Sequence, residues 1–200
     1  NPMVLEKAAV DAELTKLAVL RQAWERQQKV NAQDIKALPN WIATARTNLA
    51  NIKADMAMVD AGSHAGVITV QGVTQKSESS AQKALAIATL NAQNGITEIG
   101  SVHGFKVEVS RMALDQWRIF IKGSHTYDAG DTGSPNGVLR KAMATVADLA
   151  AHLEAQAARV DKLEKQLVDL QVEITKPFAK QARFVELRKR QFEIEAELEV

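Results

Sequence analysis

Six basic side chains are concentrated between positions 176 and 190, and Glu186 is the one acid among them. Lysine and arginine are the side chains that neutralise DNA phosphates, so a helix this basic is a candidate DNA-binding face. The chain turns acidic after position 190, and the alternative is therefore a solvated helix whose basic half pairs with acids on a neighbouring helix. The candidate phosphate-binding residues are Lys176, Lys180, Arg183, Arg188, Lys189 and Arg190.

A second candidate surface lies on the segment 117–122, which alternates apolar and charged residues. Strict alternation along a strand places three of its side chains on the face opposite Trp117. These three are Arg118, Phe120 and Lys122. An aromatic ring between two cations can contact nucleic acid or a protein partner, and packing beneath a helix is the alternative. Six basic and six acidic residues lie between positions 63 and 134, so this part of the chain has no excess positive charge to attract nucleic acid.

No set of residues predicts catalysis or metal binding. His64, His103 and His125 fall in separate segments without ligand-type spacing, so no metal or other cofactor is expected. The glycine-rich stretch 130–137 precedes a helix, but Lys141 comes too late for a phosphate-binding loop. Paired carboxylates and a nucleophile elbow are also missing, and we expect the acids of the long helices to face water. The chain is therefore predicted not to be an enzyme.

The 10 glycines divide the chain into three parts, because all of them lie between Gly62 and Gly137. The composition is 46% hydrophobic with a net charge of +1, which excludes a disordered chain and a general attraction to anionic surfaces. No apolar run approaches the ~20 residues of a membrane span, and we expect no signal peptide. The lack of cysteine excludes disulfides and fits a reducing compartment.

The two flanks that lack glycine read as long helices. Apolar residues recur at three- and four-residue steps from position 3 to 36 and again from 39 to 60, with Pro39 predicted to separate two antiparallel helices. A third helix keeps a heptad seam from Val146 to Ile174, and a fourth runs from Pro177 to about Leu198. A seam of this length can pair within the chain or with a second copy, which would make a homodimer.

The middle of the chain predicts a small sheet with one helix. β-branched and alternating segments indicate strands at 67–70, 73–74, 96–102, 105–109, 117–122 and 125–128, with a helix at about 79–92 capped by Ser79 and Gln82. The predicted fold is therefore α+β: a long antiparallel coiled-coil stalk with a small inserted head of antiparallel sheet plus helix. Residues 1–61 form a helical hairpin of the stalk, 62–134 the head, and 135–200 the helices that complete the stalk.

Several short motifs resemble the region that follows the helicase motor in very large helicase–adenine methyltransferase proteins of phages, plasmids and conjugative elements. These proteins belong to the SNF2-like, or strawberry-notch-like, helicases. The motifs are Asn1-Pro2-x-Val4-Leu5-Glu6-Lys7-x-x-Val10-Asp11-x-Glu13, Ile99-Gly100-x-x-x-Gly104-Phe105, Gly137-x-x-Arg140, Lys176-Pro177-Phe178 and Leu187-x-x-Arg190-Gln191-x-Glu193-Ile194-x-x-x-Leu198.

The resemblance implies a non-catalytic accessory domain of a DNA-processing or anti-restriction protein in the cytoplasm of a bacterial host cell. It brings no catalytic residues, because the ATP-binding and methyl-transfer motifs of the family have no counterpart here. Such a domain would bind DNA or position neighbouring domains of a larger chain, and the start at Asn1-Pro2 rather than Met fits a fragment. The alternative is a protein-interaction module, or a free-standing phage factor that inhibits a host complex through its head.

Overall fold

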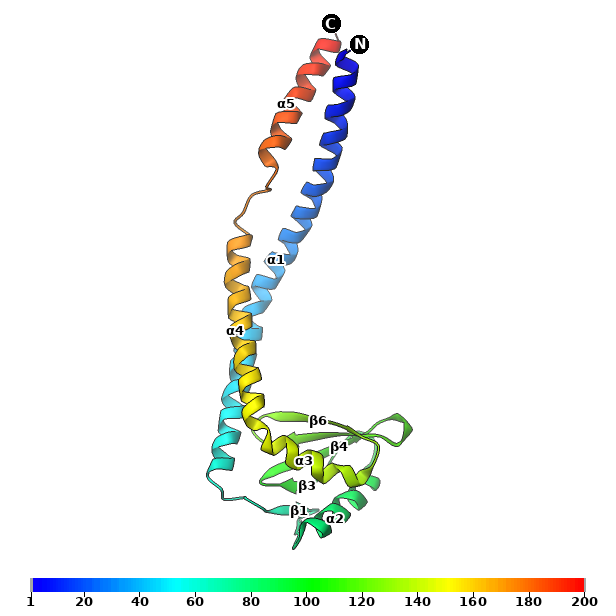
Figure 1. Ribbon diagram of the computed structural model, residues 1–200, viewed down its shortest axis with the longest axis vertical. Coiled ribbons are helices and arrows are strands. Elements are labelled where there is room, and N and C mark those ends of the chain that lie inside the picture. The colour runs from blue at the N-terminus through cyan, green and yellow to red at the C-terminus, as the bar shows by residue number, and fades with distance from the viewer. Residues whose placement is uncertain (1, 200) are drawn as a thin grey trace. The chain divides into compact units, whose positions relative to one another are not determined.

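The computed structural model describes residues 2–199 and confirms a mixed α+β fold (Figure 1). The elements in chain order are α1 (Pro2–Asp60), β1 (Ile68–Val70), β2 (Val73–Thr74), α2 (Glu78–Leu90), β3 (Ile96–Val102), β4 (Phe105–Arg111), β5 (Trp117–Lys122), β6 (Thr126–Thr132), α3 (Val138–Ala147), α4 (Leu149–Glu173) and α5 (Gln181–Leu198). Short 3-10 turns lie at Ala113–Asp115 and Pro135–Gly137.

The chain forms two compact units. The helical unit comprises the residues up to Ile42 and those from Lys162 onward, and the sheet unit comprises Ala43–Asp161. The sheet unit is wider than the predicted head at 62–134, because the end of α1, all of α3 and the first half of α4 belong to it.

The six strands of the sheet unit form one antiparallel sheet in the order β2-β1-β3-β4-β5-β6. The predicted strand pair and the following meander are confirmed, although β6 continues to Thr132 rather than ending at Asp128. Helices α2 and α3 cover one face, where Leu85 and Leu139 join the buried side chains of the central strands (Figure 1). The opposite face carries mostly polar and charged side chains, among them Glu108, Arg118 and Lys122, together with Phe120.

The predicted cap of α2 is displaced by two residues. The capping box is formed by Ser77 and Ser80, whose side chains each accept a hydrogen bond from the other residue's backbone N–H. The Ser79–Gln82 assignment was wrong because Ser80 can also complete such a box, and the helix starts as soon as its first N–H groups are satisfied.

The predicted break at Pro39 is also wrong, because α1 continues through it as a single 59-residue helix. A proline inside a helix removes one hydrogen bond and costs roughly 3 kcal/mol. Here the ring lies on an exposed side of the helix, while Leu38 and Ile42 are buried on the other side. Burial of these two apolar side chains offsets the loss, so residues 1–61 do not form a helical hairpin.

The third predicted helix is divided at Asp148 into α3 and α4. This bend allows Val146 and Leu149 to enter the same core beneath the sheet. The fourth predicted helix begins at Gln181 rather than Pro177, and α5 runs antiparallel to the first turns of α1. Val10 and Leu14 of α1 pack there against Leu187 and Ile194 of α5.

Candidate functional site

Arg183 of the predicted basic face is held by an acid on α1. Its Nε and Nη2 donate to the two carboxylate oxygens of Glu13 at 2.9 and 2.8 Å, and its Nη1 donates to Glu186 at 3.1 Å. This two-pronged contact matches the planar guanidinium to the planar carboxylate. The hydrogen bond lowers the pKa of Glu13 and raises the pKa of Arg183.

Arg190 repeats the arrangement two helical turns further along α5. Its Nε and Nη2 donate to the carboxylate of Glu6 at 2.7 and 3.0 Å, and Glu193 accepts a longer bond of 3.4 Å. The hydrogen bond with Arg190 is the main reason that the pKa of Glu6 is lowered. Two of the six predicted phosphate ligands therefore point at carboxylates of the neighbouring helix.

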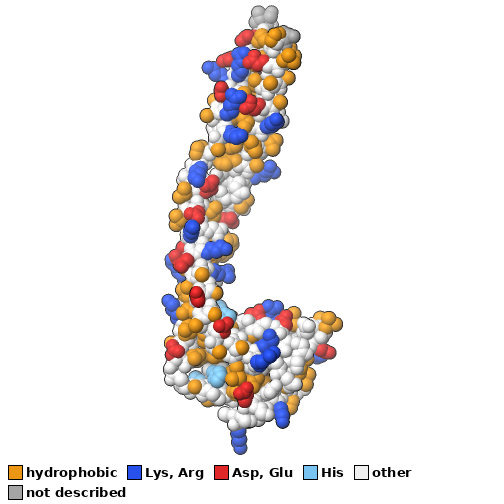
Figure 2. Space-filling view, viewed as in Figure 1, with side chains coloured by type: hydrophobic (Ala, Val, Ile, Leu, Met, Phe, Trp, Pro, Cys, Tyr) orange, Lys and Arg blue, Asp and Glu red, His pale blue; other side chains and the backbone are white. Residues whose placement is uncertain are grey.

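The other four basic residues are more dispersed. Lys176 pairs with Glu173 at 2.7 Å, and Lys189 is 80% exposed with Glu193 at 3.9 Å. Arg188 lies over the ring of Phe184, with its guanidinium carbon 5.6 Å from the ring centroid. Lys180 immediately precedes α5. In the view of Figure 2, basic and acidic side chains alternate along the helical unit and do not form a basic stripe.

The open face of the sheet holds the second predicted surface. On β5 the side chains of Trp117, Ile119 and Ile121 are buried, while Arg118, Phe120 and Lys122 alternate with them. Arg118 Nε donates to Asp128 at 3.0 Å and lies 3.9 Å from Asp131, and Lys122 lies 3.7 Å from Glu108. Phe120 is half-buried in register with Glu108 and Asp128. Both cations of the predicted surface, Arg118 and Lys122, thus lie close to acids.

A buried carboxylate at the end of α1 was missed by the sequence reasoning. Asp55 is 2% exposed and accepts hydrogen bonds from the backbone N–H of Ser124 at 2.6 Å and of His125 at 3.0 Å, and from the hydroxyl of Tyr127 at 2.7 Å. The prediction that the acids of the long helices face water is therefore wrong for Asp55. The available signal was its position beside the apolar seam residues Ile52 and Met56.

Aromatic rings surround the Asp55–Tyr127 contact. His125 and His152 meet the Tyr127 ring edge-to-face, with centroids 4.9 and 5.2 Å away. Burial, and then the hydrogen bond to Asp55, raise the pKa of Tyr127. Burial also lowers the pKa of His125, against the opposing charge of Asp55. The neutral forms of both side chains are favoured, which suits a structural cluster rather than acid–base chemistry.

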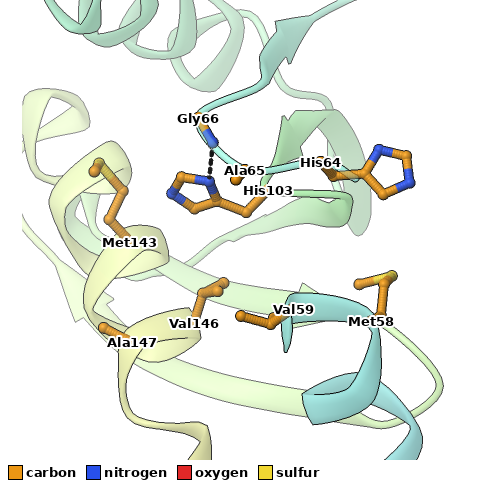
Figure 3. A pocket seen from close by; sticks show the side chains of 9 residues that line it. All are labelled: Met58, Val59, His64, Ala65, Gly66, His103, Met143, Val146 and Ala147. Carbon is orange, nitrogen blue, oxygen red and sulfur yellow. Dashed lines mark hydrogen bonds between the residues drawn. The ribbon is translucent and has the colours of Figure 1, made fainter. Parts of the chain in front are cut away.

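A mostly apolar cavity of about 330 Å³ opens beside His103 (Figure 3). Its walls are Met58, Val59, His64, Ala65, Gly66, His103, Met143, Val146 and Ala147. The ring of His103 lies toward α3, and its Nδ1 accepts a 2.9 Å hydrogen bond from the N–H of Gly66. Sequence reasoning missed this cavity, because it is assembled from four segments that are separated along the chain.

The histidines do not converge on a metal. Within residues 2–199 no three side chains among His, Asp and Glu are grouped as metal ligands. In Figure 3 the ring of His64 points away from that of His103, and it packs so close to Gly104 that an added Cβ there would lie 3.0 Å from its Cδ2. Within the same residues, no helix combines the length and apolarity that a membrane crossing requires.

The geometry of the described residues thus offers paired basic side chains, a charge-matched sheet face and one apolar cavity. A function must be inferred from these features and from the residues themselves. Comparison of the chain with protein-family models, with curated proteins and with solved structures gave no match.

Proposed function

We propose that this chain is a non-catalytic accessory module of a mobile-element helicase–methyltransferase, and that it acts by holding a protein-binding surface in position rather than by binding DNA. The resemblance of the sequence motifs supports the parent class. The observation that carries the mode of action is the two-pronged pairing of Arg183 with Glu13 and of Arg190 with Glu6.

These pairs weaken the case for DNA binding on physical grounds. A guanidinium that already donates two charge-assisted hydrogen bonds must give them up before it can contact a phosphate. Glu6 and Glu13 would also stand close to any phosphate bound at this face, and like charges repel. Nonspecific affinity for DNA comes mainly from lysine and arginine side chains that neutralise phosphates. A helix whose arginines are already paired with carboxylates therefore gains little affinity for DNA.

The helical unit is suited to act as a rigid spacer. Val10 and Leu14 of α1 form one buried apolar cluster with Leu187 and Ile194 of α5, and we propose that these contacts are the seam of an antiparallel coiled coil. The part of α1 that belongs to the helical unit ends at Ile42 and spans roughly 60 Å at 1.5 Å per residue. The paired acids and arginines fix which turns of α1 and α5 face each other, as flanking charges do in coiled coils.

The sheet unit is the part that we expect to meet a partner. The charges of its open face are balanced in pairs, so that face has no excess charge with which to select DNA. Its cavity is lined mostly by apolar side chains, which is typical of contacts with proteins or small molecules. Both features favour recognition of a protein over recognition of a polyanion.

Fluorescence anisotropy with a labelled 30-base-pair duplex and the matching single strand tests the absence of DNA binding. At 50 mM salt we expect no saturable binding below about 10 µM protein. Any remaining affinity would then be no tighter than weak nonspecific DNA binding. The double variant Arg188→Ala, Lys189→Ala should behave like the wild type. Submicromolar binding that weakens steeply with salt and is lost in this variant would overturn the proposal.

A co-purification experiment tests the second part of the proposal, that the chain binds other protein segments of the same element. The tagged chain is expressed together with the helicase and methyltransferase segments encoded by the same element, and the complex is isolated at 300 mM salt. We expect at least one of the two segments to elute with the chain in stoichiometric amount. Elution of the chain alone, with both segments folded and soluble, would contradict the proposed role.

A further inference from the structure

The cavity beside His103, a residue of the turn between β3 and β4, is formed where this turn meets three other segments. The end of α1 contributes Met58 and Val59, the connection before β1 contributes Ala65, and α3 contributes Met143 and Val146 (Figure 3). Its volume of about 330 Å³ lies at the lower end of the range for ligand pockets. One water molecule needs about 10–15 Å³ by this measure, so the cavity has room for many water-sized groups, enough for a large side chain.

His103 lines this cavity and can supply it with a hydrogen-bond donor. The backbone of His103 has a φ of +52° and that of Gly104 a φ of +89°, so the two residues form the tight turn between β3 and β4. The Nδ1 atom accepts from the N–H of Gly66, so the neutral ring carries its hydrogen on Nε2. Within residues 2–199 this Nε2–H has no acceptor, and it can donate to a bound group.

The charge of the walls restricts the occupant. The nine residues that line the cavity include no lysine, arginine, aspartate or glutamate. A charged group placed there would lose its hydration without gaining a counter-ion, which is costly. The occupant is therefore uncharged, mainly apolar, and provided with one acceptor for His103. Met58 and Met143 have flexible thioether side chains, which adapt to groups of different shape.

The rim of the cavity favours a macromolecular occupant over a free small molecule. Val59 is 38% exposed and Ala147 is exposed, although both line the cavity. A small molecule inside the cavity would leave this apolar rim in water. A protein segment would cover it, and a carbonyl of its backbone is an uncharged acceptor placed next to each side chain.

We propose that this cavity is the docking site for one large uncharged apolar side chain of a partner protein, held next to a backbone carbonyl that accepts from His103 Nε2–H. The site deepens the proposed function, and it rests on the chain acting as a protein-interaction module. It assigns that role to the junction of α1, α3 and the β3–β4 turn, rather than to Arg118, Phe120 and Lys122 on the open sheet face.

Peptide selection tests the proposal with the full chain as bait. A library of random 12-residue peptides is panned against the wild type, and enriched peptides are measured by anisotropy. We expect them to share one leucine, isoleucine, methionine or phenylalanine whose replacement by alanine abolishes binding. Ala147→Phe, which fills the rim, should weaken binding at least tenfold, and His103→Asn, which keeps a residue tolerant of positive φ, should also weaken it.

The matched control is Ala144→Phe, one turn earlier on α3, where the exposed alanine does not line this cavity. It should bind like the wild type, and circular dichroism melting should show that all three variants are folded. Three outcomes overturn the proposal: no enriched peptide, equal loss in Ala144→Phe and Ala147→Phe, or native mass spectrometry that finds a small molecule in the wild type but not in Ala147→Phe. None of them bears on DNA binding, so the proposed function is judged separately.

Discussion

The carboxylate of Asp55 on α1 accepts a 2.7 Å hydrogen bond from the hydroxyl of Tyr127 on β6. The same carboxylate accepts from the backbone N–H groups of Ser124 and His125, so it fastens the turn between β5 and β6 to the helix. Asp55 and Tyr127 are each 2% exposed. A buried charge with three donors is stable only while all of them remain in place.

Asp55→Asn should therefore destabilise the sheet unit by about 2–4 kcal/mol, because an amide cannot accept from all three donors and one buried N–H is left unpaired. Tyr127→Phe removes a single partner and should cost about 1–2 kcal/mol. Urea unfolding followed by Trp117 fluorescence, in a background with Trp24→Phe and Trp41→Phe, isolates the sheet unit. Asp60→Asn at an exposed position is the control, and equal stabilities of Asp55→Asn and this control would refute the prediction.

Gly123 is constrained by the same carboxylate. A Cβ added there would lie 2.5 Å from Asp55 Oδ1 and 2.7 Å from Phe105 Cε1. Neither group can move freely, since Asp55 is held by three hydrogen bonds and Phe105 is buried. Gly123→Ala should cost about 1–3 kcal/mol in the same urea assay, as overpacking does. Gly133→Ala, which meets nothing within 4 Å, should be nearly neutral, and a similar loss in both variants would contradict this account.

The stability of the sheet unit should fall in mildly acidic solution. Burial lowers the pKa of His125 below its usual 6.5, so the unfolded chain takes up this proton before the folded one does. The contribution of neutral His125 is complete above about pH 6.5 and is lost as the pH falls through the lower folded pKa. His125→Gln should flatten the decline in the unfolding midpoint between pH 7 and 5. An unchanged slope in this variant would show that another group is responsible.

The sheet could be predicted from the sequence because its signal is local. The alternation of Trp117 to Lys122 fixes which side chains face the helices, and Gly104 after His103 marks a tight turn. The boundaries of the helices depend less on local sequence. Pro39 argues for a break by intrinsic propensity, but α1 continues through it with Leu38 and Ile42 buried, and burial depends on the tertiary fold rather than on the local sequence.

The candidate sites likewise combine features that are visible in the local sequence with contacts between distant residues. The basic character of positions 176–190 is visible in the sequence, but the partners of Arg183 and Arg190 are Glu13 and Glu6, which are 170 and 184 residues away. No spacing rule within a segment reveals such pairs. The cavity beside His103 depends likewise on the placement of α3 against the end of α1. The sequence pattern predicts only the turn that carries His103.

The acids of α1 should be what keeps the basic helix from binding DNA. The double variant Glu6→Gln, Glu13→Gln removes the carboxylates that hold Arg190 and Arg183, and it leaves both guanidiniums able to contact phosphates. We expect it to bind a 30-base-pair duplex about tenfold more tightly than the wild type at 50 mM salt, with a salt slope steeper by about 2 for two added phosphate contacts. Glu154→Gln with Asp161→Asn changes the net charge equally at exposed positions of α4, and it should have a much smaller effect. If both double variants gain affinity alike, net charge and not the release of Arg183 and Arg190 sets DNA binding. If neither gains, the paired arginines are not what limits it.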